Sequence, residues 1–305
     1  MSSIAAPPLA QKKRKFHIAP YMLILPAIIV LLAALAYPVG WQIITSFQEY
    51  GLKQQFGQPP EWVGGANYVK IFTDPQIWAV ILRSIAFCLV NAALTVIIGV
   101  ALAVLMNSIV KGARLVLQVG LLLAWAMPVV AAMTVWLWLF NWYSGVINWV
   151  LGPAFANHNW LEDPISFYAV ATIIVVWMSV PFVAFSVYAG LTQVSGEVLE
   201  AAQLDGANGW QRFTQIILPL IRPVLMIVLL LQIIWDLRVF TQIQMLQDAG
   251  ADYNSTDLLG TFIYRTGAGS ANYGMAAAMS VFVLVLTIVL SAPYVRSLLK
   301  EDNNG

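Results

Sequence analysis

The sequence predicts an all-α, polytopic membrane protein with six transmembrane helices. The 305 residues are 60% hydrophobic and only 10% charged, whereas a soluble domain carries about 25% charged residues. The mean hydropathy is +0.79. Six stretches also reach the length of about 20 mainly apolar residues that a membrane-spanning helix needs. Lipid is therefore expected to be the main solvent of this chain.

Several of the six stretches exceed the minimum length, which predicts tilted, kinked or extended helices. Pro26, Pro38, Pro128 and Pro181 fall inside them and can kink a helix, because proline lacks a backbone N–H donor. The first stretch is too long for the apolar region of a signal peptide and lacks a clear cleavage pattern, so we expect it to be retained. The predicted spans are Ile18–Phe47, Ile77–Met106, Leu115–Phe140, Phe167–Leu191, Leu218–Met245 and Tyr273–Val295.

The distribution of Lys and Arg predicts the orientation, since cytoplasmic loops carry an excess of these residues. Ten of the fifteen lie on the side of the two termini, four lie on the opposite side, and Arg238 lies inside the fifth span. Both termini are therefore expected in the cytoplasm. The ten are Lys12, Lys13, Arg14, Lys15, Lys111, Arg114, Arg212, Arg222, Arg296 and Lys300, and the four are Lys53, Lys70, Arg83 and Arg265.

No repeat or linker divides the chain into soluble domains. We expect a cytoplasmic tail at 1–17, a transmembrane domain at 18–298 with a cytoplasmic loop at 192–219, and a second cytoplasmic tail at 299–305. The basic cluster of the first tail can contact anionic membrane lipid, although setting the topology explains it without a specific site. The outer connection 141–164 has three tryptophans and no Lys or Arg. It fits an aromatic belt at the headgroup level or a docking surface for an external partner.

Several chemistries are excluded by what the chain lacks. The net charge of +1 gives no basic field for nucleic acid, and the single Cys88 rules out an intrachain disulfide framework. His17 and His158 are too few and too far apart for a histidine metal cluster. The chain has no Gly-Lys dipeptide, so it has no GxxxxGK[ST] phosphate loop, and it lacks HExxH and GxSxG. We expect no cofactor, no metal and no catalytic residue in this chain.

The predicted cytoplasmic loop contains two short helices with a turn between them. Ser195 is a good N-cap for the first helix, and Asp205-Gly206 ends it, with the glycine at a plausible C′ position. Asn208 begins the second helix, and Gln211 follows three residues later as in a capping box. The apolar residues of this loop either fold back on the protein's own helices or are covered by a partner.

The same loop resembles the EAA motif of permeases from bacterial binding-protein-dependent ABC importers. That motif is EAA, three residues, Gly, nine residues and then Ile-x-Leu-Pro, and it precedes the penultimate span. Every fixed position is filled here. The segments VVWMSVPFVAFSVYAGL, WDLRVFTQIQML and TDLLGTFIYR resemble the carbohydrate branch of the family, which includes maltose and other disaccharide permeases. The matching residues are Glu200, Ala201, Ala202, Gly206, Ile216, Leu218 and Pro219.

The resemblance implies a half-channel in the bacterial inner membrane that pairs with a second homologous permease subunit. Two ATPase subunits would bind from the cytoplasm and carry ATP and Mg, and an extracytoplasmic solute-binding protein would dock outside. The first EAA helix would be the coupling helix, seated in a cleft of the ATPase. The expected ATPase-coupling residues are Glu200, Ala201, Ala202, Leu204, Asp205, Gly206, Ala207 and Trp210.

Polar residues within the spans mark the expected path, because such side chains are costly in hydrocarbon and face a bundle interior, a cavity or a partner. Gln232 and Asp236 are four residues apart on one helix face, whereas Arg238 shares its face with Trp235 and Gln242. They can equally make interhelical hydrogen bonds. By resemblance to maltose permease, the substrate path is expected to involve Ser179, Phe182, Gln232 and Asp236. Trp235 would offer a flat apolar face to a sugar, and Arg238 is the sixth expected path residue.

The predicted function is ATP-driven import of a carbohydrate by alternating access, with a di- or oligosaccharide expected. An ABC permease for glycerol-3-phosphate or a polyol is the first alternative, although a phosphate favours paired cations and only Arg238 is placed for that role. An integral membrane enzyme that uses Asp236 is the second, and the lack of another intramembrane carboxylate argues against it. A self-powered secondary transporter leaves the EAA stretch unexplained.

Overall fold

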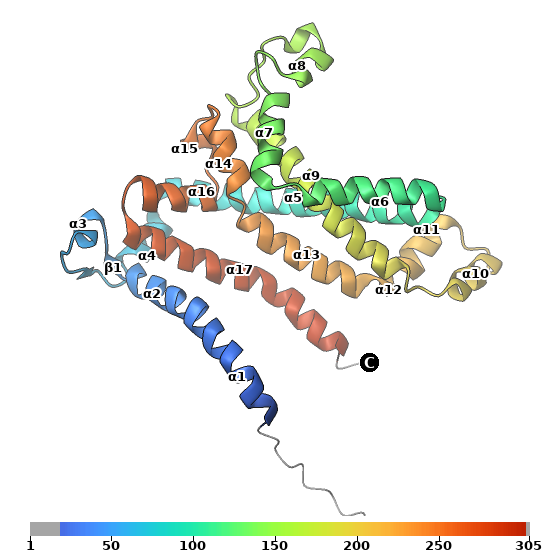
Figure 1. Ribbon diagram of the computed structural model, residues 1–305, viewed down its shortest axis with the longest axis horizontal. Helices are drawn as coiled ribbons and strands as arrows, with labels where there is room; N and C mark the ends of the chain where they lie inside the picture. The colour runs from blue at the N-terminus through green and yellow to red at the C-terminus, as the bar shows by residue number, and fades with distance from the viewer. Residues whose placement is uncertain (1–18, 303–305) are drawn as a thin grey trace, which may run out of the picture.

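Helices make up almost the whole fold (Figure 1). The computed structural model describes the backbone of residues 19–302 and the side chains of residues 22–296. The predicted tail 1–17, with its basic cluster, lies outside the described residues. The other predicted tail, 299–305, begins within the last turn of the final helix, which ends at Asp302.

The helices follow one another with short connections, and a small two-stranded antiparallel hairpin lies near the outer end of the first span. In chain order the elements are α1 Ala19–Leu31, α2 Tyr37–Ser46, β1 Gln48–Glu49, α3 Leu52–Gln55, β2 Glu61–Trp62, α4 Ala66–Thr73, α5 Pro75–Ser108, α6 Lys111–Ala126, α7 Val129–Leu139, α8 Val146–Leu151, α9 Pro164–Leu191, α10 Gly196–Leu204, α11 Gly209–Arg212, α12 Leu218–Leu220, α13 Arg222–Leu237, α14 Thr241–Asp248, α15 Tyr253–Thr256, α16 Leu259–Tyr264 and α17 Tyr273–Asp302. Single π-helical turns lie at Leu32–Ala36, Phe213–Ile217 and Arg265–Gly269, and a 3-10 turn lies at Pro153–Phe155.

Within the described residues, five helices are long and apolar enough to cross a membrane, and a sixth span arises only from a bent pair. The pair is α6 and α7, which meet at an angle of 101°. The break falls at Met127-Pro128, within the predicted third span. The residue before a proline is pushed out of the α region by the proline ring, and Met127 accordingly has ψ 127°. The expected kink at Pro128 is therefore present, as a bend slightly sharper than a right angle.

Two of the long helices begin earlier than hydrophobicity alone indicates, because each is started by an Asp-Pro pair. Asp74 accepts a hydrogen bond from the backbone N–H of Gln76 at 2.8 Å, and Asp163 accepts bonds from Ile165 at 2.9 Å and Ser166 at 3.1 Å. The proline follows at the first helical position, where its missing N–H costs nothing. These caps set where α5 and α9 begin.

The predicted fifth span is interrupted rather than continuous. Helix α13 ends at Leu237, Arg238 is its C-cap residue, and α14 resumes at Thr241. Arg238 is exposed at this break and does not lie inside a regular helix. The span also begins later than predicted, since the residues from Phe213 to Leu220 form a π turn and the short helix α12 before α13 starts at Arg222.

The core of the bundle is formed by α5 packed along α9, with α13 against both. The closest approach is at Gly99 of α5, where an added Cβ would lie 2.5 Å from Cγ1 of Val183. Small residues let helices in a membrane approach closely. By contrast, the apolar residues of α1 are exposed, and α1 lies apart from the bundle in Figure 1.

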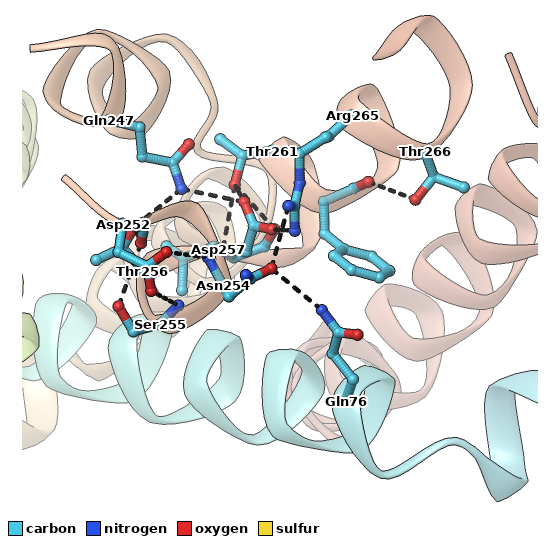
Figure 2. A network of polar contacts seen from close by, with 12 residues as sticks. Gln76, Gln247, Asp252, Asn254, Ser255, Thr256, Asp257, Thr261, Arg265 and Thr266 are labelled. Carbon is cyan, nitrogen blue, oxygen red and sulfur yellow. Dashed lines mark hydrogen bonds and ion pairs between the residues drawn. The ribbon is translucent and has the colours of Figure 1, made fainter. Parts of the chain in front are cut away.

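A polar network holds the segment α14–α16 against the outer half of α5 (Figure 2). Asp257 is fully buried and forms an ion pair with Arg265, and it also accepts hydrogen bonds from Gln247 at 3.0 Å and Thr261 at 3.1 Å. The carboxylate is therefore compensated on several sides, which a buried charge requires.

The network is connected to α5 by further bonds, one of them from Gln76 to Asn254 at 3.5 Å (Figure 2). Arg83 donates to the backbone oxygen of Asn254 at 2.9 Å, and the N–H of Leu259 donates to Ser84 Oγ at 2.8 Å. Arg83 thus fixes the loop that contains Asn254. The start of α17 is also closely packed, because an added Cβ at Gly274 would lie 2.2 Å from the backbone oxygen of Gln48.

Candidate functional site

The loop between α9 and α13 folds as two helical segments with a turn, as its sequence predicts. Helix α10 ends at Leu204 with Asp205 as its C-cap residue, and Gly206 follows with φ +84°. The N–H of Gly206 bonds to the oxygen of Gln203 at 3.1 Å, and the N–H of Ala207 bonds to that of Ala202 at 3.0 Å. Such bonds satisfy the last carbonyls of a helix that ends at a left-handed residue. The chain therefore reverses at the predicted glycine.

The second helical segment starts with the predicted capping box. The N–H of Gln211 donates to Asn208 Oδ1 and the N–H of Asn208 donates to Gln211 Oε1, both at 2.9 Å. The predicted cap of the first helix is different, because Ser195 occupies the N-cap position of α10 but its side chain makes no capping bond. The segment from Gly209 then passes through the π turn into α12, so it leads towards α13 instead of forming an isolated helix.

The apolar side chains of this loop divide between the inside and the outside. Ala202 is buried and Ala207 is half-buried, whereas Leu204 is 89% exposed and Trp210 is 72% exposed. The remaining predicted coupling residues are also exposed, namely Glu200, Ala201, Asp205 and Gly206. Exposed large apolar groups that cluster on one segment mark an interaction site. Folding back on the protein's own helices does not cover Leu204 or Trp210.

Three aromatic rings from three helices form a row on the accessible side of the bundle. The ring of Phe182 on α9 lies 5.0 Å from that of Trp235 on α13 and 6.4 Å from that of Trp125 on α6, measured between centroids. Trp125 and Trp235 are exposed, and Phe182 and Ser179 are half-buried. We call Trp125, Phe182 and Trp235 the aromatic row. The sequence interpretation missed Trp125, although its position just before the Met127-Pro128 break is a usable signal.

Gln232 and Asp236 share one face of α13, as predicted, and that face is buried. Gln232 Nε2 donates to Asp236 Oδ1 at 2.8 Å. Their other oxygens, Gln232 Oε1 and Asp236 Oδ2, are buried without a hydrogen-bond partner. Asp236 and Arg238 form no ion pair in the described residues, which agrees with their predicted opposite directions. The structure therefore separates the predicted path residues into a buried polar pair and an accessible aromatic row.

Comparison with known proteins identifies a family. Residues 95–296 match the family described as "Binding-protein-dependent transport system inner membrane component". This match covers the helices from the middle of α5 to α17, including the loop α10–α11 and all three rings of the aromatic row.

Two curated relatives match over almost the whole length. The chain is 39% identical to the diacetylchitobiose uptake system permease protein DasB of Streptomyces coelicolor over 291 residues, which cover 94% of this chain and 88% of DasB. It is 32% identical to the trehalose/maltose transport system permease protein MalF of Thermococcus litoralis, with 90% of this chain and 92% of the relative covered.

A solved structure shares the fold. It is the crystal structure of a bacterial ABC transporter involved in the import of the acidic polysaccharide alginate, with a TM-score of 0.79 and 25% identity. The alignment covers 92% of this chain and 95% of the solved chain. Sequence and fold agree over nearly the whole length, so the chain belongs to the binding-protein-dependent transport system inner membrane components, a family of transport subunits rather than enzymes.

Proposed function

We propose that this chain is one permease subunit of an ATP-driven carbohydrate importer and forms half of the translocation path. The observation that carries the proposal is the aromatic row, which three helices present together on an accessible side. Binding sites for small molecules are lined mainly by apolar and aromatic groups, with a few polar groups that fix orientation. A pyranose ring has apolar C–H faces that stack on aromatic rings, and Ser179 and Arg238 are the polar neighbours in sequence.

The substrate class is supported by the relatives. One is a diacetylchitobiose permease and another is a trehalose/maltose permease, so we propose a di- or oligosaccharide. Glycerol-3-phosphate or a polyol derivative remains the alternative that Arg238 favours, because its exposed guanidinium at the break after α13 can bind an anionic group.

Gln232 and Asp236 lie behind the aromatic row in the proposed mechanism. Their two unpartnered oxygens are acceptors that a water molecule or a sugar hydroxyl would satisfy if the helices separate. Direct contact with the sugar stays a prediction for this pair. Ser179, Phe182, Trp235 and Arg238 are the predicted path residues that are accessible without such a movement.

The energy for transport would come from partner subunits. We propose that two ATPase subunits bind ATP and Mg and hold α10 and α11 through Leu204 and Trp210, whose exposure supports a protein partner. Closure of the ATPases would move this loop, and the helices would expose the path to one side and then the other. A second permease would complete the path and cover exposed apolar faces, and both termini of this chain would lie in the cytoplasm.

Uptake by the assembled transporter in vesicles, with its solute-binding protein, tests the proposal. Trp235→Ala and Phe182→Ala should each lower carbohydrate uptake severalfold or more, since each removes one aromatic face from the row. Basal ATP hydrolysis should be retained. Trp41→Ala is the matched control, because Trp41 is also exposed but lies on α2, away from the row.

The outcomes separate the candidate substrates. Normal uptake by both row variants would contradict the proposed path. If the wild-type complex takes up glycerol-3-phosphate but no sugar, and Arg238→Gln abolishes that uptake, the alternative replaces the carbohydrate proposal.

A further inference from the structure

The segment between α7 and α9, residues 141–163, is a small ordered lobe with a centre of its own. The buried side chain of Asn148 donates to the backbone oxygens of Trp142 at 3.2 Å and His158 at 2.9 Å, and it accepts from Trp160 Nε1. The ring of Trp160 stacks parallel to that of Phe155, with centroids 5.7 Å apart. In Figure 1 this lobe, with α8, stands away from the helix bundle at the top of the view.

The lobe has an open cavity of about 710 Å³ on its surface. Three of its lining residues are aromatic, namely Trp142, Tyr143 and Trp149, and polar groups of Ser144, Asn148 and Asn157 lie among them. Tyr143 is 78% exposed and Trp149 is 82% exposed. The rings are thus presented to the surroundings, whereas the amide of Asn148 is used to hold the lobe together.

The backbone around the cavity is held in an uncommon conformation. Gly152 has φ +85° and Asn157 has φ +62°, in the region that few residues other than glycine, asparagine and aspartate adopt. Residues held in such conformations cluster at binding sites, where the surrounding structure fixes them. Here the bonds of Asn148 and the stacked rings provide that support, so the cavity is formed before any ligand arrives.

We infer that this cavity is an accessory binding site for a neutral sugar, outside the membrane and separate from the aromatic row. The inference rests on the proposed carbohydrate function. None of the residues that line the cavity is charged, which disfavours an anionic ligand. Its concave form and its mixture of rings, amides and a hydroxyl are those of a small-molecule site. A membrane belt requires no concavity, and docking of a protein is the other interpretation that the test below separates.

The binding of sugar to the complete transporter in nanodiscs, with no solute-binding protein added, tests the inference. The probes are maltose and N,N′-diacetylchitobiose, measured by saturation-transfer NMR. The double variant Tyr143→Ala/Trp149→Ala should weaken binding of the preferred sugar at least tenfold. Trp62→Ala is the matched control, because Trp62 is exposed on β2 and lies outside the lobe. Trp235→Ala removes sugar binding at the aromatic row, so binding that remains in this variant reports on the cavity of the lobe.

A second variant tests the site without disturbing the fold of the lobe. Asn157→Gly keeps the positive φ at no steric cost and removes only the amide, and it should weaken sugar binding severalfold. The affinity of the solute-binding protein for each variant is measured in parallel. Unchanged sugar binding in both variants would overturn the inference. So would a loss of solute-binding-protein affinity with sugar binding intact, because the lobe would then be a docking surface. Failure of the wild-type complex to transport any sugar would instead refute the proposed function.

Discussion

Gly206 is the residue on which the geometry of the loop between α10 and α11 depends. Its φ of +84° strongly favours a glycine, yet no atom of another part of the chain lies within 4 Å of the position that a Cβ would take. Gly206→Ala should therefore cost only the backbone strain, about 1–2 kcal/mol, and lower substrate-stimulated ATP hydrolysis. Gly206→Asn should be milder, since asparagine tolerates this region. Gly209→Ala is the control, as Gly209 also faces open space without a positive φ.

A bulky residue at the same position gives a separate test of the partner. Because the space beside Gly206 is open in this chain, Gly206→Trp has no neighbour of its own to clash with. We expect it to abolish ATPase stimulation or assembly well beyond the effect of Gly206→Ala, which the ATPase activity and composition of purified complexes would show. Equal effects of the two variants would mean that no partner covers this turn.

The sequence was most informative about single residues with local partners. The capping box of Asn208 and Gln211 and the turn at Gly206 depend on neighbours within three residues, so their types and spacing predict them. Side chains within the membrane are different. The shared face of Gln232 and Asp236 follows from helical periodicity, but its burial depends on which helices pack against α13, and periodicity does not contain that information.

At the scale of elements, the contact of α5 with α9 at Gly99 should control the stability of the bundle. A methyl group there would overlap the branched side chain of Val183, and overpacking costs about 1–3 kcal/mol. Gly99→Ala should lower the midpoint of thermal unfolding of the purified complex. Gly120→Ala on α6, where the space is open, should not lower it, because alanine favours a helix over glycine. Equal midpoints for the two variants would contradict the packing argument.

The polar network of Figure 2 is the second feature that determines how the elements pack, since it joins α14–α16 to α5. Arg265→Gln leaves the carboxylate of Asp257 buried without its cation, and breaking a buried pair in this way costs about 3–5 kcal/mol. We expect an unstable complex by thermal unfolding. The double variant Arg265→Gln/Asp257→Asn removes the uncompensated charge and should recover part of the loss. No recovery would show that the ion pair is not the main contribution of Arg265.

Helices were predicted well where the length of an apolar stretch determines them. They were predicted less well where a local break in the backbone determines their ends. Five spans correspond to helices near the expected residues, whereas the 101° bend at Met127-Pro128 turns the third into a pair. The proline indicated a kink, but the size of the bend depends on packing of α7 against α14 and of Trp136 on α7 against Trp177 on α9. The polar network of Figure 2 could not be predicted either, because Arg83 and Asn254 are far apart in sequence.

At the scale of the whole molecule, a single chain leaves large apolar side chains uncovered. The apolar faces of α1, Leu204 and Trp210 are all exposed, and a folded transporter in a membrane covers such surfaces with lipid or partner subunits. Which of these faces would line the proposed path therefore depends on neighbours outside this chain. This explains why the predicted path included both the accessible Trp235 and the buried Asp236.

The orientation of the molecule gives the last prediction. Reporters fused after Lys111 and after Arg212 should both report the cytoplasm, and one placed within residues 157–163 should report the outside. In Figure 1 the start of α6 lies beside α11, whereas α8 lies away from that end. The start of α6 and α11 therefore lie near each other and away from α8, and the reporters test whether the bent pair of α6 and α7 is one crossing.

Among the described side chains the two predicted sides carry similar numbers of Lys and Arg, so the predicted asymmetry depends on the basic cluster Lys12–Lys15. Neutralising that cluster should weaken the orientation, which a mixed reporter signal would reveal. A consistent reversal of all three reporters would place the loop α10–α11 outside and refute its role in ATPase coupling.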